Sequence, residues 1–389
     1  MPLRRLLHPI RELSEQGKLA GLLLIAATAV SLLVSNSGVG PAYRAFWETE
    51  VGYGLLQKSL AHWVNDGLMA IFFLLVGLEI KREVLYGELA QPRQALVPAL
   101  AALGGVAVPA LLFLSFTRGT AASAGWAIPT ATDIAFSLGI LSLLGNRVPF
   151  GLRVFLTALA IIDDLLAVII IAVFYSAGLH VLYLLAAAGV FALLLLLNRL
   201  RVRRLAPYLL LGLLLWFCVL ESGIHATIAG VLLALAIPVG RLERLEHALQ
   251  RPVNYLVLPL FALCNTAIVL TGNVGASLAS PLAWGVGAGL LLGKPLGIVG
   301  VTAGLVRLGW GELPVGVSWR RFIGLGFTAG IGFTMAIFIA TLSFQQPAEV
   351  DVAKLAVLLG SAASAVVGIL ILAPGRPPEL ERPDDGAEA

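Results

Sequence analysis

Long apolar segments constrain this chain more than any other feature of its sequence. Of the 389 residues, 59% are hydrophobic and only 12% are charged, too few to cover the surface of a soluble domain of this length. Hydropathy indicates about twelve segments long enough to cross the hydrocarbon core of a bilayer. Their centres lie near Ala26, Phe72, Gly105, Phe136, Leu165, Phe191, Leu213, Gly230, Pro259, Leu291, Phe333 and Leu359. The sequence therefore predicts an all-α polytopic membrane protein, with residues 207–219 and 223–238 as the least separated pair of segments.

Basic residues are distributed unevenly between the predicted loops. If the N-terminus lies inside and the segments alternate in direction, most of the 26 Lys and Arg residues fall in inside loops. The outside stretches hold only Arg44, Lys58, Arg118 and Lys354, and Lys294 remains within an apolar segment. This bias predicts that both termini of the multi-pass protein are cytoplasmic. The net charge of +4 follows from this topology, so no nucleic-acid partner is expected.

One membrane domain accounts for nearly the whole chain. Residues 1–373 are predicted to form a single integral membrane domain. Residues 374–389 are rich in proline and acidic residues, a composition that predicts a disordered cytoplasmic tail.

Asp163 and Asp164 stand side by side in the apolar run ALAIIDDLLAVIIIA (158–172). A charge at the bilayer centre costs at least about 3 kcal/mol on insertion scales, so an acid there indicates function. Neighbours on a helix are about 100° apart, so the two carboxyl groups share a neighbourhood but can face different partners. The alternative is that one acid only pairs with a buried base for structure.

Two segments are poorly suited to continuous helices. In WAIPTATDIAFSLG (126–139), Pro129 lacks a backbone donor and is followed by two threonines and an aspartate. In GLGFTAGIGFTMA (324–336), four glycines within nine residues weaken the helix. Unwound backbone at membrane depth is tolerated only where it is buried in protein or lines a cavity.

The two interrupted segments also resemble each other. When residues 131–141 are aligned with 328–338, three apolar pairs match, Ser137 meets Thr334, and Asp133 meets Gly330. The predicted topology makes the two segments cross in opposite directions. This pattern is typical of an inverted-topology repeat with discontinuous helices that cross near the midplane. Chance similarity between two spans rich in glycine and alanine is the alternative.

Lys294 and Asp133 are the candidates to compensate the like dipole ends of two facing half-helices. Lys294 is too central to reach the interface easily, so it is expected either to pair with a carboxylate or to lose its proton more readily than an exposed lysine. A buried base with two buried acids forms a site that can load protons. With the Thr132 hydroxyl and free backbone carbonyls, the site offers the oxygen ligands that small hard cations prefer. Since a carboxylate pair cannot hold a cation and protons together, alternating access would exchange one for the other.

Other ionisable residues have competing interpretations. Asp66 either lines a funnel or is interfacial, while Glu79 runs into Lys81, Arg82 and Glu83, which favours a solvated cytoplasmic cluster. His225 either titrates near neutrality or is a hydrogen-bonded structural residue. For Glu246 and His247, a solvated charged face is the default expectation and pH sensing the alternative.

Six blocks in order along nearly the whole chain resemble the NhaA family of sodium/proton antiporters. They are NDGLMAIFFLLVGLEIKRE (65–83), GWAIPTATDIAF (125–136), ALAIIDDL (158–165), SGIHAT (222–227), GKPLG (293–297) and GIGFTM (330–335). The NhaA fold is itself a known example of an inverted repeat with two broken helices, so that arrangement is what the resemblance implies. It also implies an electrogenic secondary transporter, not an enzyme, that takes protons inward and moves sodium or lithium outward in sodium and pH homeostasis. No cofactor is implied.

The resemblance also implies roles for residues. Asp163 and Asp164 would carry the transported sodium or lithium ion and the protons, with Asp164 as the direct ligand and Asp163 alternating between Lys294 and the open site. Thr132 belongs to the ion site, and Asp133 balances the helix dipoles. A pH-response cluster would contain Glu79, Arg82, Glu83, Glu246 and His247. Family members form homodimers through the first outside loop, which suggests a hairpin at residues 41–54.

Two departures from the family pattern affect the expectations. Thr130 stands where alanine is expected, so an extra hydroxyl beside the unwound segment is predicted to shift ion preference. The loop 239–250 is short, with Glu243 in place of a base and Gln250 in place of a histidine, which bears on the pH profile.

Three other classes of function fit the sequence less well. An intramembrane aspartyl protease that used Asp133 and Asp163 would need a Gly-x-Gly-Asp context, which residues 130–133 lack. A prenyl-transfer enzyme that held magnesium on Asp163 and Asp164 would need further acids one turn away, where residues 165–167 are apolar. A passive cation channel would be expected to carry rings of acids rather than the lone Lys294.

Overall fold

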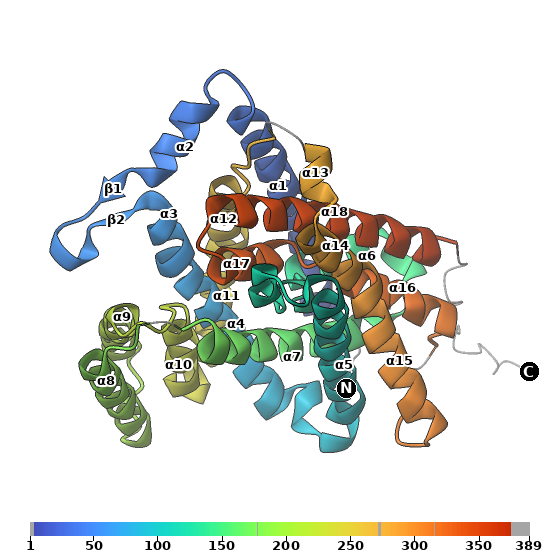
Figure 1. The fold of residues 1–389 in the computed structure, drawn as a ribbon. Coiled ribbons are helices and arrows are strands. Elements are labelled where there is room, and N and C mark those ends of the chain that lie inside the picture. Colours follow the sequence, from blue (N-terminus) through green and yellow to red (C-terminus); the bar gives the residue numbers. More distant parts are fainter. Residues whose placement is uncertain (1–3, 177, 271–273, 315, 375–389) are drawn as a thin grey trace, which may run out of the picture.

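The computed structural model describes residues 4–176, 178–270, 274–314 and 316–374. The predicted tail, residues 374–389, lies outside this part of the chain except for Pro374. The described residues are almost entirely helical, with one two-stranded hairpin (Figure 1). The helices are α1 (Arg4–Ser35), α2 (Gly40–Glu48), α3 (Leu60–His62), α4 (Met69–Tyr86), α5 (Pro92–Thr117), α6 (Ile134–Leu143), α7 (Phe150–Phe174), α8 (Val181–Arg199), α9 (Ala206–Glu221), α10 (Ile228–Ala236), α11 (Val239–Pro252), α12 (Leu258–Asn265), α13 (Val274–Leu278), α14 (Pro281–Ala288), α15 (Lys294–Arg307), α16 (Trp319–Ala329), α17 (Phe333–Ser343) and α18 (Pro347–Leu372).

Several helices are long and apolar enough to cross a membrane. Among the described residues there are five such helices, or up to eight if each sharply bent pair counts as one span. The five are 94–117, 150–174, 181–199, 281–307 and 347–372. These helices confirm the predicted all-α membrane protein, while the number twelve stays a prediction. The weakly separated segments predicted at 207–219 and 223–238 become α9 and the nine-residue α10.

The central helix α7 carries the paired acids. It begins directly after Pro149 and runs for 25 residues, most of them Leu, Ile, Val, Ala or Phe. At 1.5 Å per residue it is about 37 Å long, enough to cross a hydrocarbon core. Its buried positions include both acids, so these carboxyl groups lie in the interior of the helix bundle.

Both segments that the sequence predicted to be interrupted are broken in the structure. Pro129 lies in a 3₁₀ turn, η5 (Ile128–Thr130), and after a short extended stretch the chain continues as α6 with a bend of 44°. α16 and α17 are separated by Gly330–Gly332 and bend by 42°. The two breaks meet, because the Asp133 backbone N–H donates to the Ile331 carbonyl oxygen over 2.7 Å. Backbone groups freed by each break thus find partners in the other.

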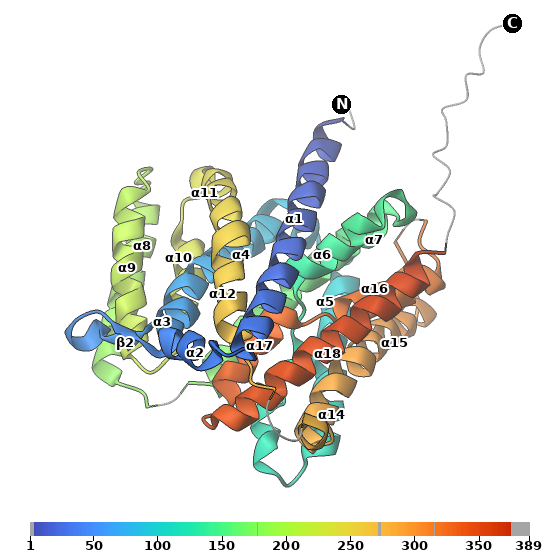
Figure 2. The ribbon, with the colours of Figure 1, turned by 90° about the horizontal axis from the view of Figure 1, so that it is seen from above.

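The helices around this crossing pack closely. α5 and α15 approach through glycines: a Cβ on Gly297 would lie 2.1 Å from the Gly104 carbonyl oxygen. A π-helical turn, η8 (Gly289–Gly293), leads from α14 into α15 and places Lys294 at the start of that helix. In both overall views α8 and α9 lie together at one edge of the molecule (Figures 1 and 2).

Two local expectations are corrected by the structure. The hairpin predicted at 41–54 consists of helix α2 followed by β1 (Glu50–Val51) and β2 (Lys58–Ser59), which pair antiparallel. It projects from the body of the molecule beside α3 (Figure 2). Residues 239–250, predicted to be a short loop, form most of helix α11, because leucines at 242, 245 and 249 give them an apolar face.

Candidate functional site

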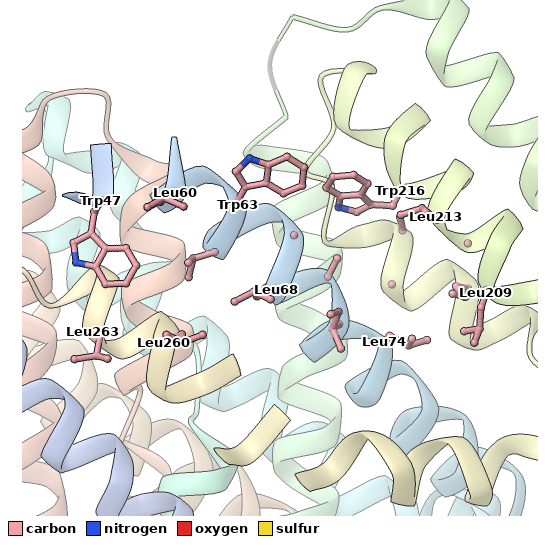
Figure 3. Close-up of a pocket in the computed structure, with 18 of the residues that line it drawn as sticks. Trp47, Leu60, Trp63, Leu68, Leu74, Leu209, Leu213, Trp216, Leu260 and Leu263 are labelled. Carbon is pink, nitrogen blue, oxygen red and sulfur yellow. The ribbon is translucent and has the colours of Figure 1, made fainter. Parts of the chain in front are cut away.

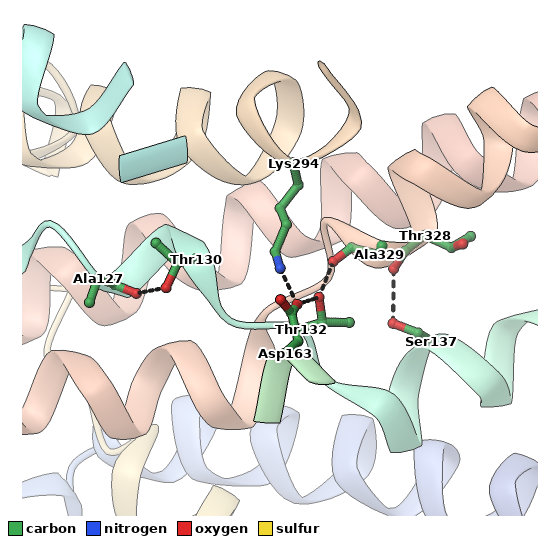
Figure 4. Close-up of polar contacts among 8 residues, drawn as sticks. All are labelled: Ala127, Thr130, Thr132, Ser137, Asp163, Lys294, Thr328 and Ala329. Carbon is green, nitrogen blue, oxygen red and sulfur yellow. Dashed lines mark hydrogen bonds and ion pairs between the residues drawn. The ribbon is translucent and has the colours of Figure 1, made fainter. Parts of the chain in front are cut away.

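Asp163, Thr132 and Lys294 come together at the crossing of the broken helices (Figure 4). The Lys294 ammonium forms an ion pair and hydrogen bond with Asp163 Oδ2. The Thr132 hydroxyl oxygen lies 2.6 Å from the same Asp163 Oδ2 and 2.8 Å from the Ala329 carbonyl oxygen. All three side chains are at most 2% exposed. The base thus lies beside a carboxylate, as the sequence predicted, and shares it with the hydroxyl of the unwound segment.

The carboxyl groups of Asp163 and Asp164 still have free capacity. Asp163 Oδ1 is buried and has no hydrogen-bond partner among the described residues. Asp164 is only 3% exposed, and its ionisable neighbours are Asp163, Glu79, Asp133 and Lys294. Together with Asp164, these are four acids around one base, and they carry a surplus of negative charge when ionised. Since unpaired charges are costly in a low-dielectric interior, this site favours uptake of protons or a small cation.

Asp133 bridges the two half-helices that begin at the crossing. Its Oδ1 accepts from Phe136 N of α6 over 2.9 Å, and its Oδ2 accepts from Thr334 N and Thr334 Oγ1 of α17 over 3.0 and 2.5 Å. One carboxylate therefore caps two helix N-termini, where positive partial charge gathers. The dipole-balancing role of Asp133 stays a prediction, and these contacts at both N-termini are compatible with it.

The carbonyl ends at the crossing are satisfied by hydroxyl groups. Ser137 Oγ donates to Thr328 O over 2.8 Å, and Thr132 Oγ1 lies within hydrogen-bond distance of Ala329 O. Lys294 contacts Asp163, as described above, and its compensation of the helix dipole ends stays a prediction. Sequence reasoning did not assign Ser137 or Thr334 to the site. The sequence signal that could have identified them is that these two hydroxyl residues, each within an apolar span, align with each other.

Thr130 does not contribute its hydroxyl to the ion site. Its Oγ1 donates to Ala127 O over 2.8 Å within the 3₁₀ turn, away from Asp163 (Figure 4). Thr130 is 2% exposed, so this bond satisfies a buried donor. The structure therefore shows no direct contact through which the Thr130 hydroxyl could change the ion preference.

A second polar cluster lies near the start of the second predicted span. His62 Nε2 is 3.4 Å from Asp66 Oδ2, and Trp216 Nε1 donates to Asp66 O over 2.9 Å. His225 Nε2 lies 2.9 Å from Tyr175 O, the carbonyl that follows α7. His225 thus has a backbone partner, as in the structural interpretation, and also lies close to Asp66. The cluster connects the end of the acid-bearing helix to α9 and to the loop before α10.

The acids at the other end of α4 are less solvated than expected. Glu246 on α11 is 1% exposed and pairs with Arg82 over 2.6 Å, while Arg82 also contacts Glu83 over 3.2 Å. Glu79 is half-buried. The expected solvated face is therefore wrong for Glu246, because α11 packs against α4, while the solvated cluster around Glu79 stays a prediction. His247, the next residue of α11, is exposed as expected.

Lys354 takes part in a further polar contact. The sequence assigned it to an outside stretch, which stays a prediction, and the structure places it two turns inside α18, half-buried. Its Nζ is 3.4 Å from Asn265 Oδ1, and Asn265 Nδ2 donates to Asn65 Oδ1 over 2.7 Å. A polar contact thus connects α18, α12 and the residue next to Asp66.

A large apolar hollow lies apart from the paired acids. It has a volume of about 860 Å³ between α4, α9, α10 and α12, and Trp47, Trp63 and Trp216 line its rim (Figure 3). None of Asp163, Asp164, Thr132 and Lys294 lines it. Its apolar walls do not suit an ion, so the paired acids remain the candidate site.

Helical spans and a buried, charge-imbalanced acid pair at broken helices define an integral membrane transporter of small cations. The sequence profile of the family described as Na+/H+ antiporter 1 matches residues 11–372. The chain belongs to this Na+/H+ antiporter family, which indicates sodium/proton exchange.

Relatives named Na(+)/H(+) antiporter NhaA match over nearly their full length. The protein of Oleidesulfovibrio alaskensis is 45% identical over 97% of each chain. That of Cytophaga hutchinsonii is 50% identical over 92% of this chain and 93% of its own. That of Rhodospirillum rubrum is 51% identical over 91% of this chain and 94% of its own. The resemblance drawn from the six sequence blocks is confirmed, and because these antiporters are secondary transporters, the two enzyme alternatives are excluded.

Proposed function

We propose that this protein exports cytoplasmic sodium or lithium in exchange for external protons, driven by the proton gradient. The observation that carries the proposal is the buried pair Asp163 and Asp164, in which one carboxylate oxygen is free while a lysine occupies the other. Two acids and one base can release more than one proton for each monovalent cation bound. The exchange is therefore electrogenic.

The proposed cycle alternates between a protonated and a cation-bound site. When the cation enters, Asp164 binds it directly and Asp163 moves from Lys294 to the ion, with Thr132 as a further oxygen ligand. When protons return, they neutralise the carboxylates and expel the cation, and Asp163 rejoins Lys294. Asp133 holds the N-termini of α6 and α17 throughout, so that the crossing keeps its shape.

The proposed architecture has about twelve spans in an inverted repeat, and alternating access comes from movement around the crossing. Two features support it: the two breaks bend by similar angles, 44° and 42°, and the aligned residues Phe136 and Phe333 contact each other with ring centroids 5.6 Å apart. We also propose an inner-membrane location with both termini cytoplasmic, a single domain at 1–373 with a disordered tail, and a homodimer formed through the hairpin 50–59.

Dye-based transport measurements test the proposed exchange. Everted vesicles are acidified by respiration, and dequenching of a pH-sensitive dye is followed after addition of sodium, lithium or potassium from mildly acidic to mildly alkaline pH. Dequenching by sodium and lithium, but not potassium, is expected. A potential-sensitive dye then reports charge movement. No response to sodium at any pH would exclude the exchange, and a potassium response of equal size would exclude the proposed ion preference.

The ion pair between Arg82 and Glu246 gives a prediction about how exchange activity depends on pH. Further residues that we propose to take part in the pH response are Glu79, Glu83, His247, Asp66 and His225. Burial raises the pKa of the Glu246 carboxyl, and the neighbouring Arg82 guanidinium opposes that shift. Arg82→Ala removes the opposing cation, so the pKa of Glu246 rises further and its deprotonation requires a higher pH. We expect half-maximal activity to move about 1 pH unit to the alkaline side. The control is Arg244→Ala, which changes an exposed arginine on α11, the helix that carries Glu246, and equal pH profiles for the two variants would exclude this role of Arg82.

Thr130→Ala is expected to leave the preference between sodium and lithium unchanged. The hydroxyl that it removes is bonded to Ala127 O and makes no contact with Asp163. The variant should lose about 1 kcal/mol of stability, the usual contribution of a buried hydrogen bond. Michaelis constants for both ions and a melting curve measure the two effects. A changed ratio of the two constants would mean that the hydroxyl reaches the ion after all.

A further inference from the structure

The N-terminus of α17 has no side chain of its own to cap it. Its N-cap position is Gly332, and a Cβ there would lie 2.9 Å from Leu290 Cδ2 and 3.0 Å from Ala131 O. The crossing of the two broken helices therefore leaves no room for the serine, threonine or aspartate that usually occupies an N-cap. The first backbone N–H groups of α17 must find acceptors elsewhere in the molecule.

These acceptors come from two other elements. Asp133 accepts from Thr334 N, as described above. The two preceding N–H groups, of Gly332 and Phe333, both donate to Ser361 Oγ of α18 over 3.2 Å. Ser361 is 4% exposed, so no bulk water competes for these bonds. The cap of α17 is thus shared between the first broken helix and the last helix of the chain.

A second serine on the same face of α18 reaches the segment that carries the buried lysine. Ser364 follows Ser361 by one turn, is fully buried, and donates from Oγ to Leu290 O over 3.3 Å. Leu290 lies in the π-helical turn η8, which leads directly into Lys294. The Leu290 carbonyl oxygen also lies close to the break between α16 and α17, because a Cβ on Gly330 would be 2.4 Å from this oxygen. The two serines therefore contact both sides of the ion site.

We propose that Ser361 and Ser364 are positioning residues for cation binding, an inference that rests on the proposed exchange. Ser361 neutralises the exposed N–H groups at the N-terminus of α17, and Ser364 fixes the turn before Lys294 relative to that N-terminus. Loss of Ser361 leaves two uncapped N–H groups whose positive partial charge faces the acid cluster. A more positive site binds a cation less tightly but does not change the number of proton-carrying groups. The Michaelis constant for sodium therefore rises while the maximal rate changes little.

The decisive experiment compares Ser361→Ala with Ser361→Thr and with Ser31→Ala in the full-length protein in proteoliposomes. Ser31 on α1 is the control, because it is buried like Ser361 but its hydroxyl donates to Leu263 O over 2.6 Å, on α12, a helix that carries no acid. We expect the Michaelis constant of Ser361→Ala to rise about fivefold, the size of a lost N-terminal cap. Ser361→Thr, which keeps the hydroxyl, and Ser31→Ala should remain close to the wild type.

Three outcomes would overturn the proposal. The first is that the Michaelis constant for sodium does not change in Ser361→Ala. The second is that this constant rises equally in Ser31→Ala, and the third is that it rises as much in Ser361→Thr as in Ser361→Ala. If Ser361→Ala does not fold, Ser361→Cys keeps the volume with a weaker acceptor, and the same comparison applies to it. An inactive wild-type protein would instead contradict the proposed exchange, so the two failures are distinguishable.

Discussion

Asp164→Asn is expected to abolish sodium-driven proton release in everted vesicles. The variant keeps the size of the side chain but removes the charge that binds the cation and the group that carries the proton. At about 4 Å and an effective dielectric constant near 20, a lost unit charge is worth about 4 kcal/mol, or on the order of a thousandfold in affinity. Dye dequenching over the whole pH range and direct sodium-binding calorimetry measure the loss.

Two companion variants make this result specific. Asp164→Glu keeps the charge and should retain measurable exchange at a higher sodium concentration. Lys294→Arg keeps a cation beside Asp163 and should leave partial activity, because a guanidinium can replace the ammonium but fits the buried space less well. A melting curve for each variant shows whether it is folded. Full activity of Asp164→Asn in a folded protein would refute the site assignment.

Gly297→Ala is expected to have the largest effect among changes outside the charged site. The new Cβ would lie 2.1 Å from Gly104 O and 3.0 Å from Gly105 N, which are backbone atoms that cannot rotate away. α5 and α15 must therefore separate, at a cost of about 3 kcal/mol, the upper range for overpacking. Because Lys294 lies one turn earlier on α15, the separation also displaces the lysine from Asp163. We expect a lower melting temperature and a loss of exchange of about tenfold or more.

Gly300→Ala is the matched control for this prediction. Gly300 lies on the same helix, and a Cβ there would meet nothing within 4 Å. The variant should match the wild type in melting temperature and exchange. If Gly297→Ala and Gly300→Ala behaved alike, the close approach of α5 and α15 would not position Lys294.

Local properties of the sequence were sufficient to find the parts of the candidate site. The paired acids stand out because charge is expensive within an apolar run, and Lys294 stands out for the same reason. Pro129 and the glycines of 324–336 interrupt helices through their own backbone chemistry, so both breaks could be predicted. Each inference depends on a residue and its immediate neighbours along the chain.

Contacts between distant segments could not be predicted in the same way. Glu246 was expected to be solvated, yet α11 packs against α4 and places it beside Arg82. The contact of Lys354 with Asn265 was not foreseen either. Nor was the bond of the Thr130 hydroxyl to Ala127 within its own 3₁₀ turn. Each of these contacts depends on a partner or a direction, which the residue itself does not specify.

The amino-acid sequence by itself determined that this protein is a helical membrane transporter with two broken helices and a buried acid pair. Hydropathy, charge cost and helix-breaking residues are properties of short segments, so they can be read without the fold. Only the tertiary structure decided that Asp133 and Ser361 cap α17 together and that the carboxylate paired with Lys294 is Asp163. The physical reason is that hydrogen bonds and ion pairs depend on distances of about 3 Å, and packing of segments hundreds of residues apart sets those distances.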